Sequence, residues 1–183
     1  MSIVVAVKNN ERVVIASDSQ TSFGDHSIIE GNGKLIRTGD NIIGLAGWGI
    51  YSNLFQIYLQ GNPLSLARSE IDVFQFFVDF WKVLKSDYTF VSDKSTTCES
   101  PFAELDSTFI VATPKDIFYV ADDMSVVKFS EFYAIGSGSS FALGALRVIY
   151  GDDYSTEEMA KKAVEVSIGF NNSCGGKVNL EVL

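Results

Sequence analysis

Short strand-like runs and pairs of helix-spaced segments alternate along this chain, and their order is the strongest constraint on its fold. The first block of strand-like runs is 2–8, 12–18, 34–37 and 41–46. Residues 9–11 have turn composition and predict a hairpin, and the four runs together predict an antiparallel meander. The polar, Gly-containing stretch 19–33 interrupts that block without a predicted strand.

Two predicted helices follow this block. The first covers 50–60, and the second carries an aromatic stripe at helical spacing. Their predicted apolar faces are Ile50, Leu54, Ile57 and Tyr58 in the first helix, and Val73, Phe74, Phe77, Phe80, Trp81 and Leu84 in the second. We interpret the stripe as core packing and not as a ligand groove.

The second half repeats the order after a predicted loop at 91–105. Its elements are strands at 108–112, 117–120 and 132–135, helices at 139–150 and 155–168, and a last strand at 177–182. Ser155 and Glu158 have the spacing of a capping box at the start of the last helix.

This order favours α+β layering over a parallel βαβ sheet. Two antiparallel sheets, each covered by one helix pair, would bury every apolar face in a four-layer αββα sandwich, although periodicity alone does not select that arrangement. With no repeat or linker, we expect a single domain over 1–183.

Charge and hydropathy exclude several classes of function. The net charge is −9 and the longest basic run is Lys161-Lys162, so nucleic acid is not an expected partner. The most apolar segment, 71–84, contains charged residues and does not predict a membrane span. Without a secretory signal, we expect a cytoplasmic protein with reduced thiols.

Cysteine and histidine supply little material for a metal or a catalytic triad. Cys98 and Cys174 have no metal-ligand spacing, and His26, the one histidine, lies in a polar stretch that predicts a solvated loop. We therefore expect no metal and no cofactor.

Three residues suggest a different chemistry. Ser2 follows Met1 and opens the first strand, Asp18 ends the second, and Lys34 begins the third. Removal of Met1 would leave a serine whose own α-amine, with an ordinary pKa of about 7.7–8.0, acts as the base. A nearby Lys34 ammonium, oriented by Asp18, would lower that pKa. Each residue also has a plain reading: a small second residue, a strand end and an exposed lysine.

Six stretches in one order strengthen the catalytic reading. They are Ser2-Ile3-Val4-Val5-Ala6-Val7, Val13-Val14-Ile15-Ala16-Ser17-Asp18-Ser19-Gln20, Gly31-Asn32-Gly33-Lys34, Gly44-Leu45-Ala46-Gly47, Tyr133-Ala134-Ile135-Gly136-Ser137-Gly138-Ser139 and Ser173-Cys174-Gly175-Gly176-Lys177-Val178-Asn179-Leu180. In this order the chain resembles β-type subunits of the proteasome family, most closely the bacterial HslV-type peptidases, which are N-terminal nucleophile hydrolases with an αββα fold.

The resemblance implies a role for each matching position. It makes Ser2 the nucleophile, pairs Asp18 with Lys34 beside it, and assigns the oxyanion-hole donor and a substrate contact to the Gly47 N–H. Ser137 matches the hydroxyl that supports the terminal amine.

Ser22 falls where the family binds substrate main chain by strand addition.

The chain departs from the family pattern at three positions. Ser2 replaces the usual threonine, Asn171 stands where many subunits carry an aspartate, and Cys174 replaces a common serine. Asn171 can hydrogen-bond the serine but supplies no charge.

The resemblance further implies a homo-oligomeric ring that degrades peptides or unfolded protein delivered by a ring ATPase. Two alternatives remain open: a non-catalytic ring or interaction subunit, and a small-amide hydrolase on the same fold. The chain starts at the nucleophile strand without the N-terminal extension of α-type subunits, which favours the catalytic reading.

Overall fold

The two main sheets of the protein are both antiparallel. The computed structural model describes residues 2–9, 12–29, 33–65, 67–88 and 104–183. One sheet has the order β10-β1-β2-β11, with β1 Val4–Lys8, β2 Val13–Ser17, β10 Phe132–Ile135 and β11 Asn179–Val182. The other has the order β5-β6-β7-β8-β9, with β5 Leu35–Thr38, β6 Asn41–Gly47, β7 Ser107–Ala112, β8 Ile117–Val120 and β9 Val126–Phe129.

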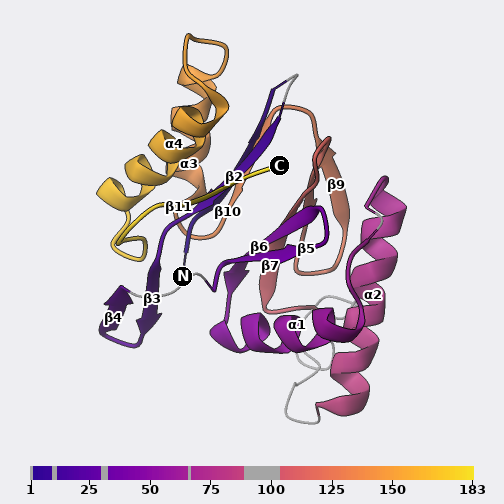
Figure 1. Cartoon of the computed structure of the whole chain (residues 1–183). Helices are drawn as coiled ribbons and strands as arrows, with labels where there is room; N and C mark the ends of the chain where they lie inside the picture. Colours follow the sequence, from indigo (N-terminus) through magenta and orange to yellow (C-terminus); the bar gives the residue numbers. More distant parts are fainter. Residues whose placement is uncertain (1, 10–11, 30–32, 66, 89–103) are drawn as a thin grey trace.

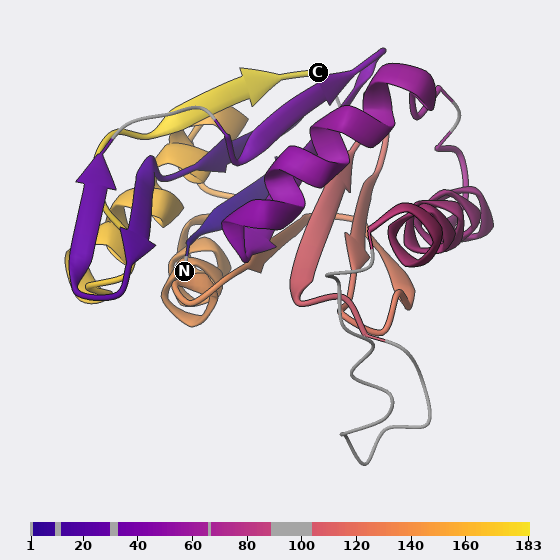
Figure 2. The same ribbon diagram turned by 90° about the horizontal axis from the view of Figure 1, so that it is seen from below.

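Two helices cover the outer face of each sheet (Figures 1 and 2). The helices are α1 Gly49–Gly61 and α2 Glu70–Asp87 on the five-stranded sheet, and α3 Ser139–Ile149 and α4 Thr156–Phe170 on the four-stranded sheet. The predicted four-layer αββα sandwich is therefore confirmed. The capping box of Ser155 and Glu158 is confirmed at the start of α4.

The predicted meander is wrong, because β2 and β5 belong to different sheets. The stretch predicted without strands forms a separate hairpin, β3 Gln20–Phe23 and β4 His26–Ile29, and carries the chain from one sheet to the other. A pattern of buried apolar residues could not reveal this hairpin, since all four residues of β4 are exposed. His26 is exposed as expected, but it lies in a strand. Strand β9 was also missed, and most of the predicted loop 91–105 lies outside the described residues.

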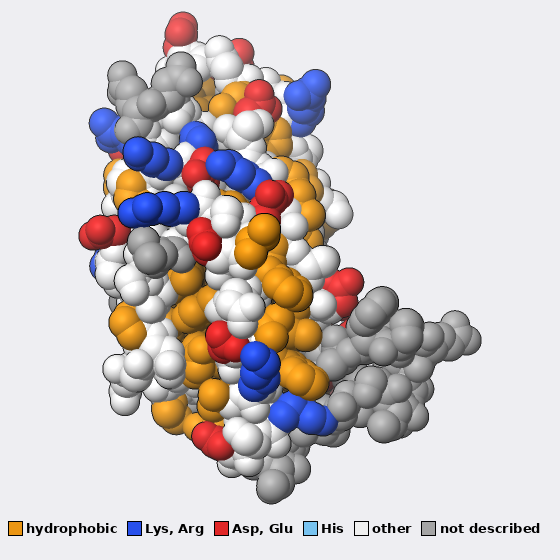
Figure 3. Space-filling model, turned by 90° about the vertical axis from the view of Figure 1, so that its right-hand side faces the viewer, with side chains coloured by type: hydrophobic (Ala, Val, Ile, Leu, Met, Phe, Trp, Pro, Cys, Tyr) orange, Lys and Arg blue, Asp and Glu red, His pale blue; other side chains and the backbone are white. Residues whose placement is uncertain are grey.

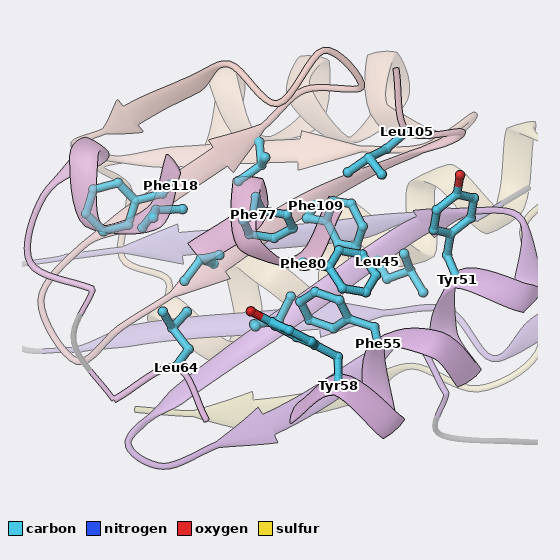
Figure 4. Packing of buried hydrophobic residues seen from close by; sticks show 14 of the residues in the cluster. Leu45, Tyr51, Phe55, Tyr58, Leu64, Phe77, Phe80, Leu105, Phe109 and Phe118 are labelled. Carbon is cyan, nitrogen blue, oxygen red and sulfur yellow. The ribbon is translucent and has the colours of Figure 1, made fainter. Parts of the chain in front are cut away.

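Aromatic side chains fill the layer between α1, α2 and the five-stranded sheet (Figure 4). Phe55 is fully buried and packs edge-on to Phe80, with ring centroids 4.7 Å apart, and tilted against Phe109 at 5.3 Å. In α2 the predicted stripe is largely core, although Phe74 is exposed. The interpretation of the stripe as packing is confirmed.

The predicted buried face of α1 is half wrong. Leu54 and Tyr58 are buried as expected, but Ile50 and Ile57 are exposed. The buried face is Tyr51, Leu54, Phe55 and Tyr58, which is an equally regular helical spacing. The larger aromatic rings of Tyr51 and Phe55 bury more apolar surface than the two isoleucines, so they face the sheet.

Exposed apolar side chains are mixed with charged ones on the surface that carries α2 and β9. Figure 3 shows this face, with apolar side chains running along it between basic and acidic groups. Ile71 and Phe74 of α2 and Val127 of β9 are exposed.

Among the described residues, no helix is both long and apolar enough to cross a membrane.

Gly44 is where the two sheets approach each other. A Cβ at this position would lie 2.5 Å from Val4 Cγ1 and 3.0 Å from Ile15 Cδ1, both on the facing sheet. Any side chain on β6 at this point would push the sheets apart. Because the Lys34 segment is attached to β6, this spacing also controls how closely the two sheets bring their polar residues together.

We expect Gly44→Ala to lower the free energy of unfolding by about 1–3 kcal/mol, since a methyl group overpacks the interface. Gly144 on α3 is the matched control, because its Cβ would meet no atom within 4 Å. There the same change should stabilise the protein by about 0.5–1 kcal/mol, as alanine replaces glycine inside a helix. Denaturant unfolding measures both, and equal effects at the two positions would contradict the packing argument.

Candidate active site

The carboxylate of Asp18 is the centre of a buried polar cluster at the end of β2. The residue has no exposed surface. Its Oδ1 accepts the backbone N–H of Ile3 at 3.0 Å, and its Oδ2 accepts those of Gln20 at 3.3 Å and Gly175 at 3.0 Å. Three backbone donors thus hold one carboxylate in place.

Lys34 supplies the cation that pairs with this carboxylate. It lies just before β5 on the opposite sheet, and its backbone oxygen accepts the N–H of Leu45 at 2.9 Å. Its ammonium bonds Asp18 Oδ1, the same oxygen that accepts from Ile3. Burial lowers the pKa of the Lys34 ammonium, because a desolvated charge is disfavoured, while Asp18 opposes that shift.

Ser2 lies directly beside this pair, since Ile3 is its neighbour in the chain. The residue is 6% exposed. Its backbone oxygen accepts the hydroxyl of Ser137 and the N–H of Gly138, each at 3.4 Å. The structure therefore brings Ser2, Asp18, Lys34 and Ser137 together from distant parts of the sequence.

Gly136 makes this close approach possible. It has φ +96°, which disfavours any residue with a side chain. A Cβ there would also overlap the backbone oxygen of Ser2. The sequence carries a signal for this residue, because Gly136 and Gly138 flank the predicted Ser137, although their pattern alone predicted no role for either glycine.

The N–H of Gly47 is directed toward the edge of β6 on which Lys34 lies. Leu45, two residues earlier, donates to Lys34 O at that edge, whereas Trp48 donates to Asp106 O on the β7 side at 3.4 Å. Because N–H groups alternate between the two edges of a strand, Gly47 shares the direction of Leu45. This orientation fits the predicted role of Gly47 as a hydrogen-bond donor to an oxyanion.

Asn171 and Cys174 lie in the loop after α4, next to Ser137. The Asn171 amide donates to the Ser137 backbone oxygen at 2.6 Å, and its side-chain oxygen accepts the N–H of Ser173 at 2.9 Å. Asn171 therefore hydrogen-bonds a serine, as expected, but this serine is Ser137 and the bond is to its backbone oxygen. Cys174 Sγ is 3.9 Å from Ser137 Oγ. Burial raises the pKa of the Cys174 thiol, and the Asp18 carboxylate acts in the same direction.

Ser22 is half-buried on β3, four residues beyond Asp18. Its hydroxyl accepts from the Gln20 side-chain amide at 3.3 Å. Gln20 and Gly175 had no predicted role, although both lie inside the six ordered stretches of sequence. In the described ranges, no group of three or more His, Cys, Asp or Glu side chains is placed to hold a metal ion.

We expect Lys34→Met to lower the free energy of unfolding by about 3–5 kcal/mol, because it leaves the Asp18 carboxylate buried without its cation. In an Asp18→Asn background the same change should cost far less, since no buried charge remains. The exposed pair of Lys82 and Asp79 on α2, at 2.9 Å, is the control, and Lys82→Met should have a much smaller effect. Denaturant unfolding measures all of these variants. If Lys34→Met had as small an effect as Lys82→Met, the argument for a buried ion pair would be contradicted.

The chain is similar in sequence to bacterial proteins named ATP-dependent protease subunit HslV. The protein from Caldanaerobacter subterraneus subsp. tengcongensis is 30% identical over 173 residues, covering 90% of this chain and 88% of the relative. The protein from Thermoanaerobacter pseudethanolicus is 28% identical with the same coverage. No protein-family model matches the chain.

Solved structures agree with the sequence relatives. Thiobacillus denitrificans BPH has a TM-score of 0.88 at 26% identity, covering 99% of this chain and 97% of BPH. The same protein in complex with epoxomicin gives 0.86 at 27% identity, with the same coverage. HslV from Trypanosoma brucei, at 22% identity, TM-score 0.71 and coverage of 99% and 98%, shares the fold. With its sandwich fold and these relatives, the chain belongs to the HslV family of proteasome-type peptidase subunits.

Proposed function

We propose that Ser2 is the catalytic nucleophile of this peptidase subunit, and that removal of Met1 activates it. One observation carries the proposal: Asp18 Oδ1 accepts both the N–H of Ile3 and the ammonium of Lys34. A single oxygen thereby ties the backbone next to Ser2 to a buried cation. The enzyme would be a threonine-protease-like endopeptidase that uses serine.

In the proposed reaction the α-amine of Ser2 takes the hydroxyl proton while Oγ attacks the carbonyl carbon of a peptide bond. The Lys34 ammonium keeps that amine unprotonated near neutral pH, because a second positive charge nearby is disfavoured. The Gly47 N–H stabilises the oxyanion, and one such donor contributes about 3–4 kcal/mol. The amine then protonates the leaving nitrogen.

Water completes the cycle by attacking the ester on Ser2, again with the α-amine as base. In this proposal the Ser137 hydroxyl supports the terminal amine of Ser2. Its hydrogen bond to the Ser2 backbone oxygen, at 3.4 Å, keeps the hydroxyl next to that residue. Asn171 acts through Ser137, whose backbone oxygen it bonds. Asn171 is therefore a positioning residue in this proposal.

The substrate would bind as an extended peptide between β3 and the Gly47 segment. Main-chain hydrogen bonds to a strand edge give affinity without requiring one particular sequence. Ser22 on β3 and the Gly47 N–H are the proposed contacts. Thiobacillus denitrificans BPH, which has the same fold, is known in complex with epoxomicin, and this supports the proposal that the fold carries a ligand-binding site.

We further propose that the subunits assemble into homo-oligomeric rings and receive unfolded protein from a ring ATPase in the cytoplasm. The relatives are named ATP-dependent protease subunits, which supports both an assembly and an ATPase. Exposed apolar side chains on the β3–β4 hairpin, Phe23, Ile28 and Ile29, support subunit contacts.

We expect Ser2→Ala to reduce turnover of fluorogenic peptides by at least about 10³-fold, because the hydroxyl is lost. Ser2→Thr should retain activity within about tenfold, since it keeps the hydroxyl and restricts its rotation. Intact-mass measurement of the active protein should show loss of Met1. Full turnover by Ser2→Ala, or an active population that retains Met1, would overturn the mechanism.

Gly136 and Gly151 provide a matched test of site geometry, because their φ angles are +96° and +95°. Gly136→Ala adds overlap with Ser2, whereas a Cβ at Gly151 meets no atom within 4 Å. Both changes should cost stability by about 1–2 kcal/mol through backbone strain, and Gly136→Ala should cost more because of the added overlap. Only Gly136→Ala should reduce peptidase turnover, by about 10²-fold, as Ser2 is displaced. Similar turnover in the two variants, measured with the same peptide, would argue against this geometry.

A further inference from the structure

The side chain of Gln20 links β3, the strand on which the substrate is proposed to bind, to the loop after α4. Gln20 is the first residue of β3 and is 8% exposed. Its amide nitrogen donates to Ser22 Oγ at 3.3 Å and to the backbone oxygen of Asn172 at 3.1 Å. One amide group therefore connects two segments that lie 152 residues apart in the sequence.

Its surroundings hold this side chain in one position. The Gln20 backbone N–H donates to Asp18 Oδ2 at 3.3 Å. On the other side, a Cβ on Gly175 would overlap the Gln20 side-chain oxygen, so the loop backbone packs directly against the amide. Since Gly175 also donates to Asp18, the amide and the buried carboxylate share the same support.

The bond from Gln20 determines how the Ser22 hydroxyl can be used. A hydroxyl has one hydrogen to donate and can accept on its lone pairs. When the Gln20 amide donates to Ser22 Oγ, the hydrogen of Ser22 is directed to a different partner. An extended peptide on β3 offers backbone carbonyl oxygens as such partners.

We propose that Gln20 is a positioning residue that presents Ser22 as a hydrogen-bond donor to a main-chain carbonyl of the substrate. This inference rests on the proposed function for the location of the substrate. Gln20 acts through Ser22 and takes no part in bond cleavage, so its removal weakens peptide binding and leaves the chemical step intact.

The test measures binding and turnover separately. Gln20→Met keeps the approximate volume of the side chain but removes its donors, and Gln20→Glu keeps the length and replaces the donors with acceptors. Each should raise KM for a fluorogenic peptide about 3- to 10-fold, the value of one hydrogen bond, with kcat within about twofold. In a Ser22→Ala background the effect of either variant on KM should disappear.

Peptide binding to the Ser2→Ala variant gives a readout that needs no catalysis. Fluorescence anisotropy with a labelled form of the same peptide should show that Gln20→Met raises Kd about 3- to 10-fold in this background. Gln75→Met on α2 is the matched control, because the Gln75 amide donates to Asp79 on the exposed surface at 3.0 Å. That variant should change neither Kd nor KM.

The outcomes separate the two proposals. If the peptide binds and Gln20→Met weakens binding, but the wild-type protein does not cleave it, the proposed function fails and the role of Gln20 stands. A drop in kcat at constant KM, or an undiminished effect in the Ser22→Ala background, would overturn the role of Gln20. An unchanged Kd in Gln20→Glu and Gln20→Met, each shown to be folded by circular dichroism, would also overturn it.

Discussion

The buried ion pair of Asp18 and Lys34 is the interaction on which the rest of the site depends. Asp18 ends a strand of one sheet and Lys34 precedes a strand of the other, so the pair connects the two halves of the sandwich. A carboxylate buried in this way is tolerated only when other groups replace its lost hydration. Here the backbone N–H groups of Ile3, Gln20 and Gly175 do so, and each comes from a segment that contributes to the site.

Glycine at particular positions lets these segments approach one another. Gly44 allows the sheets to pack closely, Gly136 allows a turn to pass against Ser2, and Gly175 allows the last loop to pack on Gln20. The site is therefore made mostly from backbone that side chains would keep apart. This explains how its polar groups come together although they come from both ends of the chain.

Two of the three departures from the usual residues of the family, Asn171 and Cys174, lie around Ser137 and not at the Asp18–Lys34 pair. Asn171 bonds the Ser137 backbone, and Cys174 contacts the Ser137 hydroxyl. Both therefore contact Ser137 and reach Ser2 only through it. An amide serves this purpose without a charge. The Asp18–Lys34 pair is unaffected by either departure.

The sequence by itself determined the α+β class, because runs of strands followed by pairs of helices favour it over a parallel sheet. Apolar periodicity was compatible with the four-layer sandwich but did not select it. The sequence also identified Ser2, Asp18, Lys34, Gly47, Ser137 and Asn171 as candidates through ordered motifs. It did not reveal the β3–β4 hairpin, the buried face of α1 or the contacts of Gln20. The hairpin is too exposed for a hydrophobic pattern, α1 has two regular spacings, and the Gln20 amide meets a residue 152 positions away. Only the tertiary structure decided these, because each depends on which distant segments come into contact.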